Sequence, residues 1–145
     1  FPGYLRGTLD RSRAERTTLG QELELVRRYL EIMAIRLGPR LRWHVEAEPS
    51  LAHVALPALA LQPFVENAIR HGLEPLAEGG EVTVTARRES GDVVIDVADT
   101  GIGWSGTSAP GVGVENVRQR LTARYGDRAD VSVHPVDPRG VRVRV

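Results

Sequence analysis

The stretch LQPFVENAIRHG, residues 61–72, is the most informative part of this 145-residue sequence. Helical spacing places its apolar residues on one side, and these are Phe64, Val65, Ala68 and Ile69. Asn67, Arg70 and His71 stand at i, i+3 and i+4 and share the other side, with Glu66 beside them. An amide oxygen, a guanidinium and an imidazole suit a site for phosphate and Mg²⁺, because Mg²⁺ prefers oxygen ligands and shares them with substrate phosphates. An ordinary solvated polar face is the alternative, and it explains this stretch equally well when the stretch is taken alone.

A second polar group stands at the end of an expected strand. Residues 93–97 carry apolar side chains at alternate positions, and the same period of two places Asp99 on their apolar face. A carboxylate there needs a hydrogen-bond donor, which a base with an exocyclic amine would supply. Asp99 begins the segment DTGIG, in which Gly101 and Gly103 leave room for a flat ring near the backbone. The alternative is that Asp-Thr-Gly only begins a turn.

The segment GVGVEN, residues 111–116, begins another expected helix. Glycines ahead of a helix N-terminus leave backbone N–H groups able to bind an anion. This is not the dinucleotide-binding fingerprint, because no third glycine follows at the required spacing. The chain also has no lysine for a P-loop. The alternative is a flexible loop with a glycine-bounded helix start.

Residues 18–37 predict the longest helix, with an apolar stripe formed by Leu19, Leu23, Val26, Leu30, Met33 and Leu37. Thr18 and Gln21 form a capping box at its start, and Gly38 marks its end. The stripe is too short for a typical coiled coil. It is also widened by Leu25, Tyr29 and Ile32. We therefore expect the helix to pack on the core of its own domain.

Alternation of apolar and polar residues predicts strands at 41–47, 82–87, 93–99, 131–133 and 141–145. Ser90-Gly91-Asp92 predicts a hairpin turn. Further helices are expected at 58–72 and 114–125, with Pro63 either bending the first or marking its true start. Because no strand is continuously apolar, the sheet should be mixed and mostly antiparallel, with one solvated face. The fold class is therefore α+β, a two-layer sandwich with about three helices on one face of the sheet.

Composition and charge exclude several classes of protein. All 19 basic residues are arginine, and 19 acidic residues give a formal net charge of zero. This balance argues against a nucleic-acid-binding protein or a polybasic membrane module. The absence of cysteine excludes disulfides, cysteine-ligated zinc, iron–sulfur clusters and thiol catalysis. No apolar run approaches the roughly 18 residues of a membrane helix.

Taken in order, the three segments resemble the conserved boxes of the GHKL ATPase superfamily, which has the Bergerat fold. ELELVRRYLEI at 22–32, RLG at 36–38, and residues 61–72 and 116–126 are more closely similar to LytS/YehU-type sensor histidine kinases. The resemblance covers about residues 18–145. It implies the catalytic domain of a two-component histidine kinase, binding ATP and Mg²⁺. Residues 1–17 would be an N-terminal arm, a remnant of the dimerisation region or a linker from it.

The resemblance also implies roles for individual residues. Asn67 would ligate the Mg²⁺ that bridges the ATP phosphates, Arg70 would contact phosphate, and His71 would stack on or bond near the nucleotide. Asp99 would accept a hydrogen bond from the adenine N6 amine. Glu66 is a candidate acid/base or supporting residue, so the candidate catalytic residues are Asn67, Glu66 and His71. The remaining nucleotide-binding candidates are Gly101, Gly103, Gly111, Gly113 and Asn116.

Residues 103–113 would form a mobile ATP lid between the two glycine boxes. Arg118 and Arg120, on the following helix, are further phosphate candidates, and a solvated helix face is their alternative. The chain departs from the family at Thr100, where Asn is usual. A hydroxyl can still hold a water there.

The family's phosphoacceptor is not recognisable among the histidines of this chain, which are His44, His53, His71 and His134. We therefore expect this part to bind ATP without phosphorylating itself, the acceptor lying on a dimerisation domain. The resemblance implies a response regulator partner, of the LytTR type, and no nucleic-acid partner. It also implies a homodimeric full-length protein, with this part alone monomeric, and a cytoplasmic position in a bacterial membrane-anchored sensor.

Three other functions share the same boxes. Self-sufficient GHKL ATPases place a general-base Glu four residues before the Asn, where this chain has Pro63. Anti-sigma-factor serine kinases fit poorly at 29–37 and at Gln62-Pro63. A degenerate nucleotide-binding or interaction module is opposed by the intact box residues.

Overall fold

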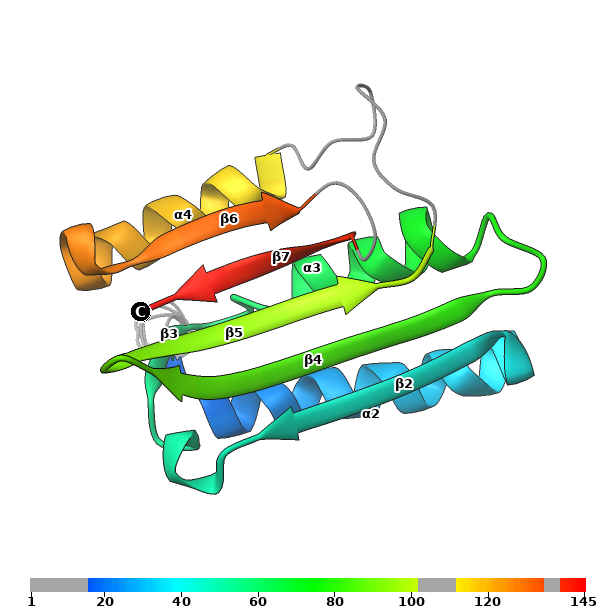
Figure 1. Cartoon of the computed structure of the whole chain (residues 1–145), viewed down its shortest axis with the longest axis horizontal. Coiled ribbons are helices and arrows are strands. Elements are labelled where there is room, and N and C mark those ends of the chain that lie inside the picture. Colours follow the sequence, from blue (N-terminus) through cyan, green and yellow to red (C-terminus); the bar gives the residue numbers. More distant parts are fainter. Residues whose placement is uncertain (1–15, 102–111, 135–138) are drawn as a thin grey trace, which may run out of the picture.

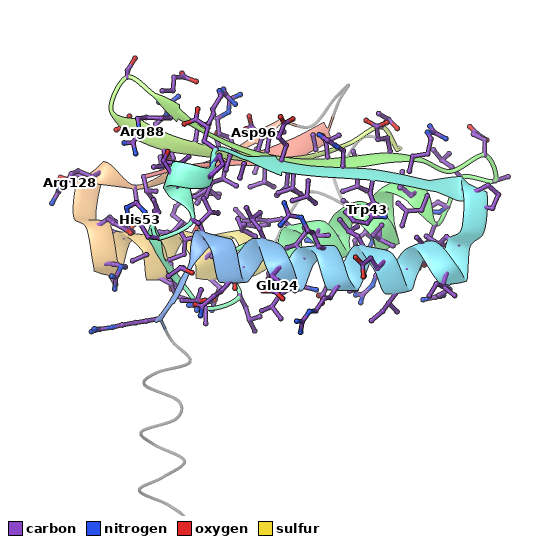
Figure 2. The ribbon with its side chains drawn as sticks, turned by 90° about the horizontal axis from the view of Figure 1, so that it is seen from below. Glu24, Trp43, His53, Arg88, Asp96 and Arg128 are labelled. Carbon is purple, nitrogen blue, oxygen red and sulfur yellow. The ribbon has the colours of Figure 1, made fainter. Side chains whose placement is uncertain are left out.

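The computed structural model describes residues 16–101, 112–134 and 139–145, which form two layers. Figures 1 and 2 show a sheet with the helices packed on one of its faces. The helices are α2 (Leu19–Leu37), α3 (Gln62–Asn67) and α4 (Val112–Tyr125). The strands of the sheet are β2 (Leu41–Ala47), β4 (Gly80–Glu89), β5 (Asp92–Asp99), β6 (Asp130–His134) and β7 (Arg139–Arg144). Short 3₁₀ turns occupy Gly38–Arg40, Pro49–Leu51 and Gly126–Arg128. The predicted α+β sandwich is confirmed.

The strand order is β2-β4-β5-β7-β6, and β2 pairs with β4 in parallel while the other neighbours are antiparallel. β4 and β5 form the predicted hairpin. Its two-residue loop has positive φ at Ser90 (51°) and Gly91 (87°), the geometry that suits the twist of a tight hairpin. A separate ribbon joins β1 (Arg16–Thr18) to β3 (Ala55–Pro57). Arg16 and Thr17, which the sequence assigned to the N-terminal arm, therefore pair with β3.

The long helix α2 packs on the sheet as the sequence predicted. Thr18 Oγ1 accepts a hydrogen bond from the Gln21 N–H, and Gln21 Oε1 accepts one from the Thr18 N–H, both at 3.2 Å. Its buried apolar residues are Leu19, Leu23, Val26, Leu30 and Met33. The prediction that Leu25 and Ile32 widen this stripe is wrong, because their side chains are 45% and 64% exposed. Tyr29 does pack against the core.

The helix predicted over residues 58–72 begins later than expected. It starts at Gln62, so Pro63 lies in its first turn, where a missing N–H costs no intrahelical hydrogen bond. Of the two alternatives, Pro63 thus marks the true start. The residues ahead of it instead form β3 and a loop. After Asn67 the chain continues as a π-helical turn over Ala68–Leu73, in which hydrogen bonds run from i to i+5.

The face of the sheet turned away from the helices carries a row of alternating charges. In order of contact these are Arg142, Asp96, Arg87, Glu89, Arg144 and Asp92. Asp96 lies on this face in Figure 2, and it accepts hydrogen bonds from Arg142 Nε at 2.7 Å and from Arg87 at 3.0 Å. Val94 lies between Arg87 and Arg144 in the register and is fully buried. The arginine stems thus shield an apolar residue on the solvated face.

Asp96→Asn tests the contribution of this row to stability. Burial raises the pKa of Asp96, but the hydrogen bonds from Arg142 and Arg87 outweigh it and hold that pKa below its usual value of 3.8. A lowered folded-state pKa stabilises the fold above the unfolded-state value, and this stabilisation is lost as pH falls through the folded-state pKa. We expect the variant to lower the free energy of unfolding by about 1 kcal/mol near neutral pH. In urea unfolding the difference should shrink below about pH 4, and a constant difference would contradict this origin.

Candidate nucleotide-binding site

The end of β5 packs directly against the π-helical turn through two glycines. A Cβ atom at Gly101 would overlap the backbone carbonyl of Gly72, so position 101 leaves no room for a side chain. Gly72 and its neighbour Leu73 are buried. The motif at 99–101 and the motif at 61–72 therefore meet in space, although more than one strand separates them in the sequence.

Asp99 is the last residue of β5 and is only 3% exposed. Val93, Ile95 and Val97 are buried on the same face, which confirms the predicted alternation. The carboxylate accepts a hydrogen bond from the Gly101 N–H at 2.9 Å. Such a bond orients the carboxylate and offsets part of the cost of burying it.

Thr100 links the end of β5 to β4 through two hydrogen bonds. Its Oγ1 accepts a hydrogen bond from the Glu81 N–H at 2.9 Å, and its own N–H donates to the Glu81 carbonyl at 3.0 Å. A Cβ at Gly80 would come within 2.6 Å of Thr100 Oγ1 and within 2.9 Å of Leu73. Close packing at Gly80 and Gly101 therefore fixes the end of β5 relative to the π-helical turn.

Asn67 is the last residue of α3 and is half-buried, whereas Arg70 and His71 are exposed on the π-helical turn. Because hydrogen bonds in this turn span one residue more than in an α-helix, the α-helical spacing used in the prediction does not apply beyond Asn67. The turn ends where the Glu74 N–H donates to the Ile69 carbonyl at 2.9 Å. Single π-helical turns occur frequently at functional sites.

Glu66 on α3 bonds to its own helix, and its charge acts on Tyr29 of α2. Its Oε1 accepts a hydrogen bond from Gln62 Nε2 at 3.5 Å, one helical turn earlier. Burial raises the pKa of Tyr29 on α2, and the negative charge of Glu66 raises it further. The carboxylate of Glu66 is thus close enough to α2 for its charge to act on that tyrosine.

Two of the remaining candidates belong to α4. Gly113 and Asn116 lie in its first turns, and the Asn116 side chain is exposed. Gly103 and Gly111, with most of the expected lid, lie outside the described residues. Two arginines of α4 donate hydrogen bonds to backbone carbonyls: Arg118 donates to Val131 at 2.8 Å, and Arg120 donates to Ala58.

One buried charge, Glu22 on α2, was not among the predicted site residues. It is 1% exposed and accepts hydrogen bonds from the backbone N–H groups of Leu59 and Leu61. Its position was a usable signal, because it stands three residues after Leu19 and four before Val26, within the buried stripe.

The donor set suits a cation that is shared with a ligand. Among residues 16–101, 112–134 and 139–145, no group of three His, Cys, Asp or Glu side chains could hold a metal ion. Asn67 offers a hard amide oxygen at the end of α3. A Mg²⁺ ion bound there would take its other ligands from phosphate oxygens and water, as Mg²⁺ usually does.

Two family models match the sequence. The model described as histidine kinase-, DNA gyrase B-, and HSP90-like ATPase matches residues 54–145, which include both Asn67 and Asp99. The model described as histidine kinase matches residues 1–41, which include all of α2.

Curated relatives match over most of this chain. The sensor histidine kinase YesM of Bacillus subtilis is 30% identical over 97% of the chain and 25% of its own length. The sensor histidine kinase BtsS of Escherichia coli is 38% identical over 90% of the chain and 23% of its own length. The chain thus spans about a quarter of the length of these relatives.

Solved structures share the fold at low sequence identity. The histidine kinase domain of a blue-light activated histidine kinase from Erythrobacter litoralis is 20% identical, with a TM-score of 0.64 over 88% of this chain and 60% of its own. The catalytic domain of histidine kinase ThkA is 12% identical, with a TM-score of 0.66 over 90% of this chain and 95% of its own.

Proposed function

Because this chain belongs to the family of histidine kinase-, DNA gyrase B- and HSP90-like ATPases, we propose that it is the ATP-binding catalytic domain of a two-component sensor histidine kinase. The names of YesM and BtsS, both sensor histidine kinases, support the proposal. The chain spans about a quarter of their length. We therefore also propose, for the whole protein, the activity of a sensor histidine kinase.

The observation that carries the proposal is the packing of Gly101 on Gly72. It brings the end of β5, which carries the buried Asp99, against the π-helical turn that follows Asn67. An acceptor for an exocyclic amine and a hard oxygen for a phosphate-bound cation thus belong to one rigid unit. A nucleoside triphosphate presents both of the complementary groups.

In the proposed complex each residue has a distinct task. Asp99 accepts a hydrogen bond from the adenine N6 amine, and Gly101 leaves room for the ring. Asn67 ligates Mg²⁺, whose charge offsets that of the phosphates. Arg70 contacts phosphate, and His71 lies against the nucleotide. Further contacts come from Gly103, Gly111, Gly113 and Asn116, and Glu66 supports Asn67 from the α2 side.

The proposed reaction is transfer of the γ-phosphoryl group to a histidine of the dimerisation domain. A bond forms between an imidazole nitrogen and the γ-phosphorus while the bond from that phosphorus to the β–γ bridging oxygen breaks. ADP leaves with the electron pair, and the ring, positively charged after the attack, gives the proton on its other nitrogen to the solvent. We propose that the acceptor is a histidine of the dimerisation domain and not one of the four histidines of this chain, which are His44, His53, His71 and His134. This chain binds and orients ATP, which is the main requirement of such a transfer.

The proposed partners are the dimerisation domain of the same protein, in a homodimer, and a response regulator of the LytTR type. Histidine kinase ThkA has been solved in complex with the response regulator TrrA. That structure supports a response regulator as the class of partner, while the LytTR type rests on the sequence resemblance. We further propose that the domain lies on the cytoplasmic side of a membrane-anchored sensor.

Asn67→Ala tests the proposed metal ligand. Calorimetry with ATP should show at least tenfold weaker binding in the presence of Mg²⁺, a loss of about 1.4 kcal/mol or more. Without Mg²⁺ the variant and the unaltered chain should bind ATP almost equally, because the Asn67 amide acts on ATP only through the cation. Gln119→Ala, which removes an exposed amide from α4, is the matched control and should leave affinity unchanged. An equal loss with and without Mg²⁺ would contradict the role in metal binding, and no binding by the unaltered chain would contradict the proposed function.

A further inference from the structure

A buried carboxylate of α2 holds the loop that leads into α3. Glu22 is 1% exposed, and its two oxygens accept hydrogen bonds from the N–H groups of Leu59 and Leu61, each at 3.2 Å. A buried carboxylate is costly unless its oxygens are bonded, and here each oxygen has a donor. Two hydrogen bonds, at Leu59 and Leu61, therefore connect the loop to α2.

The backbone of the loop is held in a conformation that its sequence does not favour. Leu59 has a φ of 58°, in the left-handed region that glycine or asparagine usually occupies. Its side chain is 52% exposed, so packing of that side chain does not impose the conformation. Strained backbone persists where its surroundings determine it. The bond from the Leu59 N–H to Glu22 is such a determinant.

The same segment is held from its other side by α4. We use the name strap for residues 55–61, which comprise β3 and the loop after it. Arg120 donates a hydrogen bond to the Ala58 carbonyl, and the Tyr125 hydroxyl donates one to the Ala55 carbonyl. Figure 1 shows β3 at the end of the molecule where α2 begins and α4 ends. The strap is therefore bonded to both helices.

A continuous set of bonds leads from Glu22 to the candidate site. Leu61 donates to Glu22 and is also the N-cap of α3, which has no side-chain cap of its own. The Leu61 carbonyl in turn accepts the N–H groups of Phe64 and Val65, at 3.0 and 3.2 Å. Asn67 lies at the end of this same short helix. Glu22 is thus linked, through the N-cap of α3, to the short helix that ends at Asn67.

We propose that Glu22 is a positioning residue for the nucleotide site, fixing the strap so that Asn67 meets the cation and phosphates. This rests on the proposed function and deepens it. The family model for histidine kinases matches residues 1–41, which contain Glu22. Through the strap, this buried carboxylate links the position of α2 to that of Asn67.

Glu22→Gln tests the hydrogen bonds of this carboxylate most directly, because it keeps the size of the side chain. An amide has one oxygen acceptor, and its NH₂ group would face a backbone N–H where Glu22 accepts two bonds. We expect Mg²⁺–ATP to bind about tenfold more weakly, the size of effect that follows loss of one charge-assisted hydrogen bond. Glu24→Gln is the matched control, since Glu24 is exposed on the same helix and pairs only with Arg28 among the described residues. The control should change affinity less than twofold.

The readout separates positioning from stability. Affinity is measured by calorimetry at a temperature where urea titrations show each variant to be fully folded. If Glu22→Gln lowers the unfolding midpoint but binds Mg²⁺–ATP like the unaltered chain, the inference is wrong and the proposed function stands. If the unaltered chain itself fails to bind, the proposed function is wrong.

Amide hydrogen exchange on the unaltered chain decides the question even if Glu22→Gln does not fold. Because coupling between two sites is reciprocal, ligand bound at Asn67 must also stabilise the bonds at Glu22. Mg²⁺–ATP should slow exchange at the Leu59 and Leu61 amides more than at the Val93 amide in β5, which donates to the Val145 carbonyl at 2.7 Å. Equal slowing at all three amides would overturn the proposal.

Discussion

Gly101→Ala should be the most destabilising single substitution considered for this protein. Its Cβ would overlap the carbonyl of Gly72, so the end of β5 and the π-helical turn would have to separate. Both partners are backbone, and no flexible side chain can move aside. We expect the free energy of unfolding to fall by about 3 kcal/mol or more, at the upper end of the range for overpacking. Urea unfolding followed by circular dichroism measures it.

Gly91→Ala is the control for this substitution. Gly91 has a positive φ of 87°, but no atom lies within 4 Å of a Cβ built there. Alanine at position 91 should therefore cost only the backbone strain, about 1 kcal/mol. Equal effects of the two substitutions would mean that Gly101 and Gly72 are not in close contact in solution. Any folded Gly101→Ala protein should also bind ATP poorly, since the displaced strand end carries Asp99.

Asp99→Asn should have the largest effect on nucleotide binding at the base. The amide can still accept a hydrogen bond from the Gly101 N–H, which now bonds to the carboxylate at 2.9 Å. Its NH₂ group, however, presents a donor where the proposed adenine amine also needs an acceptor. We expect ATP to bind 10- to 100-fold more weakly, about 1.4 to 2.7 kcal/mol. Calorimetry with Mg²⁺–ATP measures the change.

Base selectivity gives the same prediction a second test. Guanine carries a carbonyl oxygen where adenine carries its exocyclic amine, so a carboxylate favours ATP over GTP and an amide does not. The ratio of ATP to GTP affinity should therefore fall in Asp99→Asn. Asp96→Asn makes the identical chemical change on the opposite face of β5, and it should alter stability without altering this ratio. A ratio unchanged in Asp99→Asn would contradict the role of Asp99 at the base.

Local signals were sufficient to predict most of the fold. The capping box at Thr18, the tight turn at Ser90-Gly91 and the alternation ahead of Asp99 each depend on neighbours in sequence, and each is confirmed. The predicted start of the helix at 58–72 was wrong, because the start of this helix depends on contacts with residues distant in sequence. Glu22 holds the strap in extended and left-handed backbone, which residue propensities at 55–61 do not reveal.

The sequence indicated which residues to consider for the candidate site, but it did not predict how these residues are arranged in space. Alternation placed Asp99 correctly at the buried end of its strand. The α-helical spacing of Asn67, Arg70 and His71 could not show that a π-helical turn follows Asn67, because that turn depends on tertiary packing. The close approach of Gly101 to Gly72 also depends on the whole sheet and helix layer. Exposure of Leu25 and Ile32 was missed because apolar content does not show which helix face meets the sheet.

The parallel pairing of β2 with β4 has a consequence for the order of folding. β4 and β5 are joined by two residues and can pair early, whereas β2 reaches β4 only after residues 48–79 have been closed into a loop. Closing such a loop costs chain entropy before its contacts form, so non-local pairing is slow. That loop contains the strap, α3 and the π-helical turn. The proposed nucleotide site is thus assembled in the same late step that completes the sheet, so we expect a chain that has formed only its hairpin to lack it.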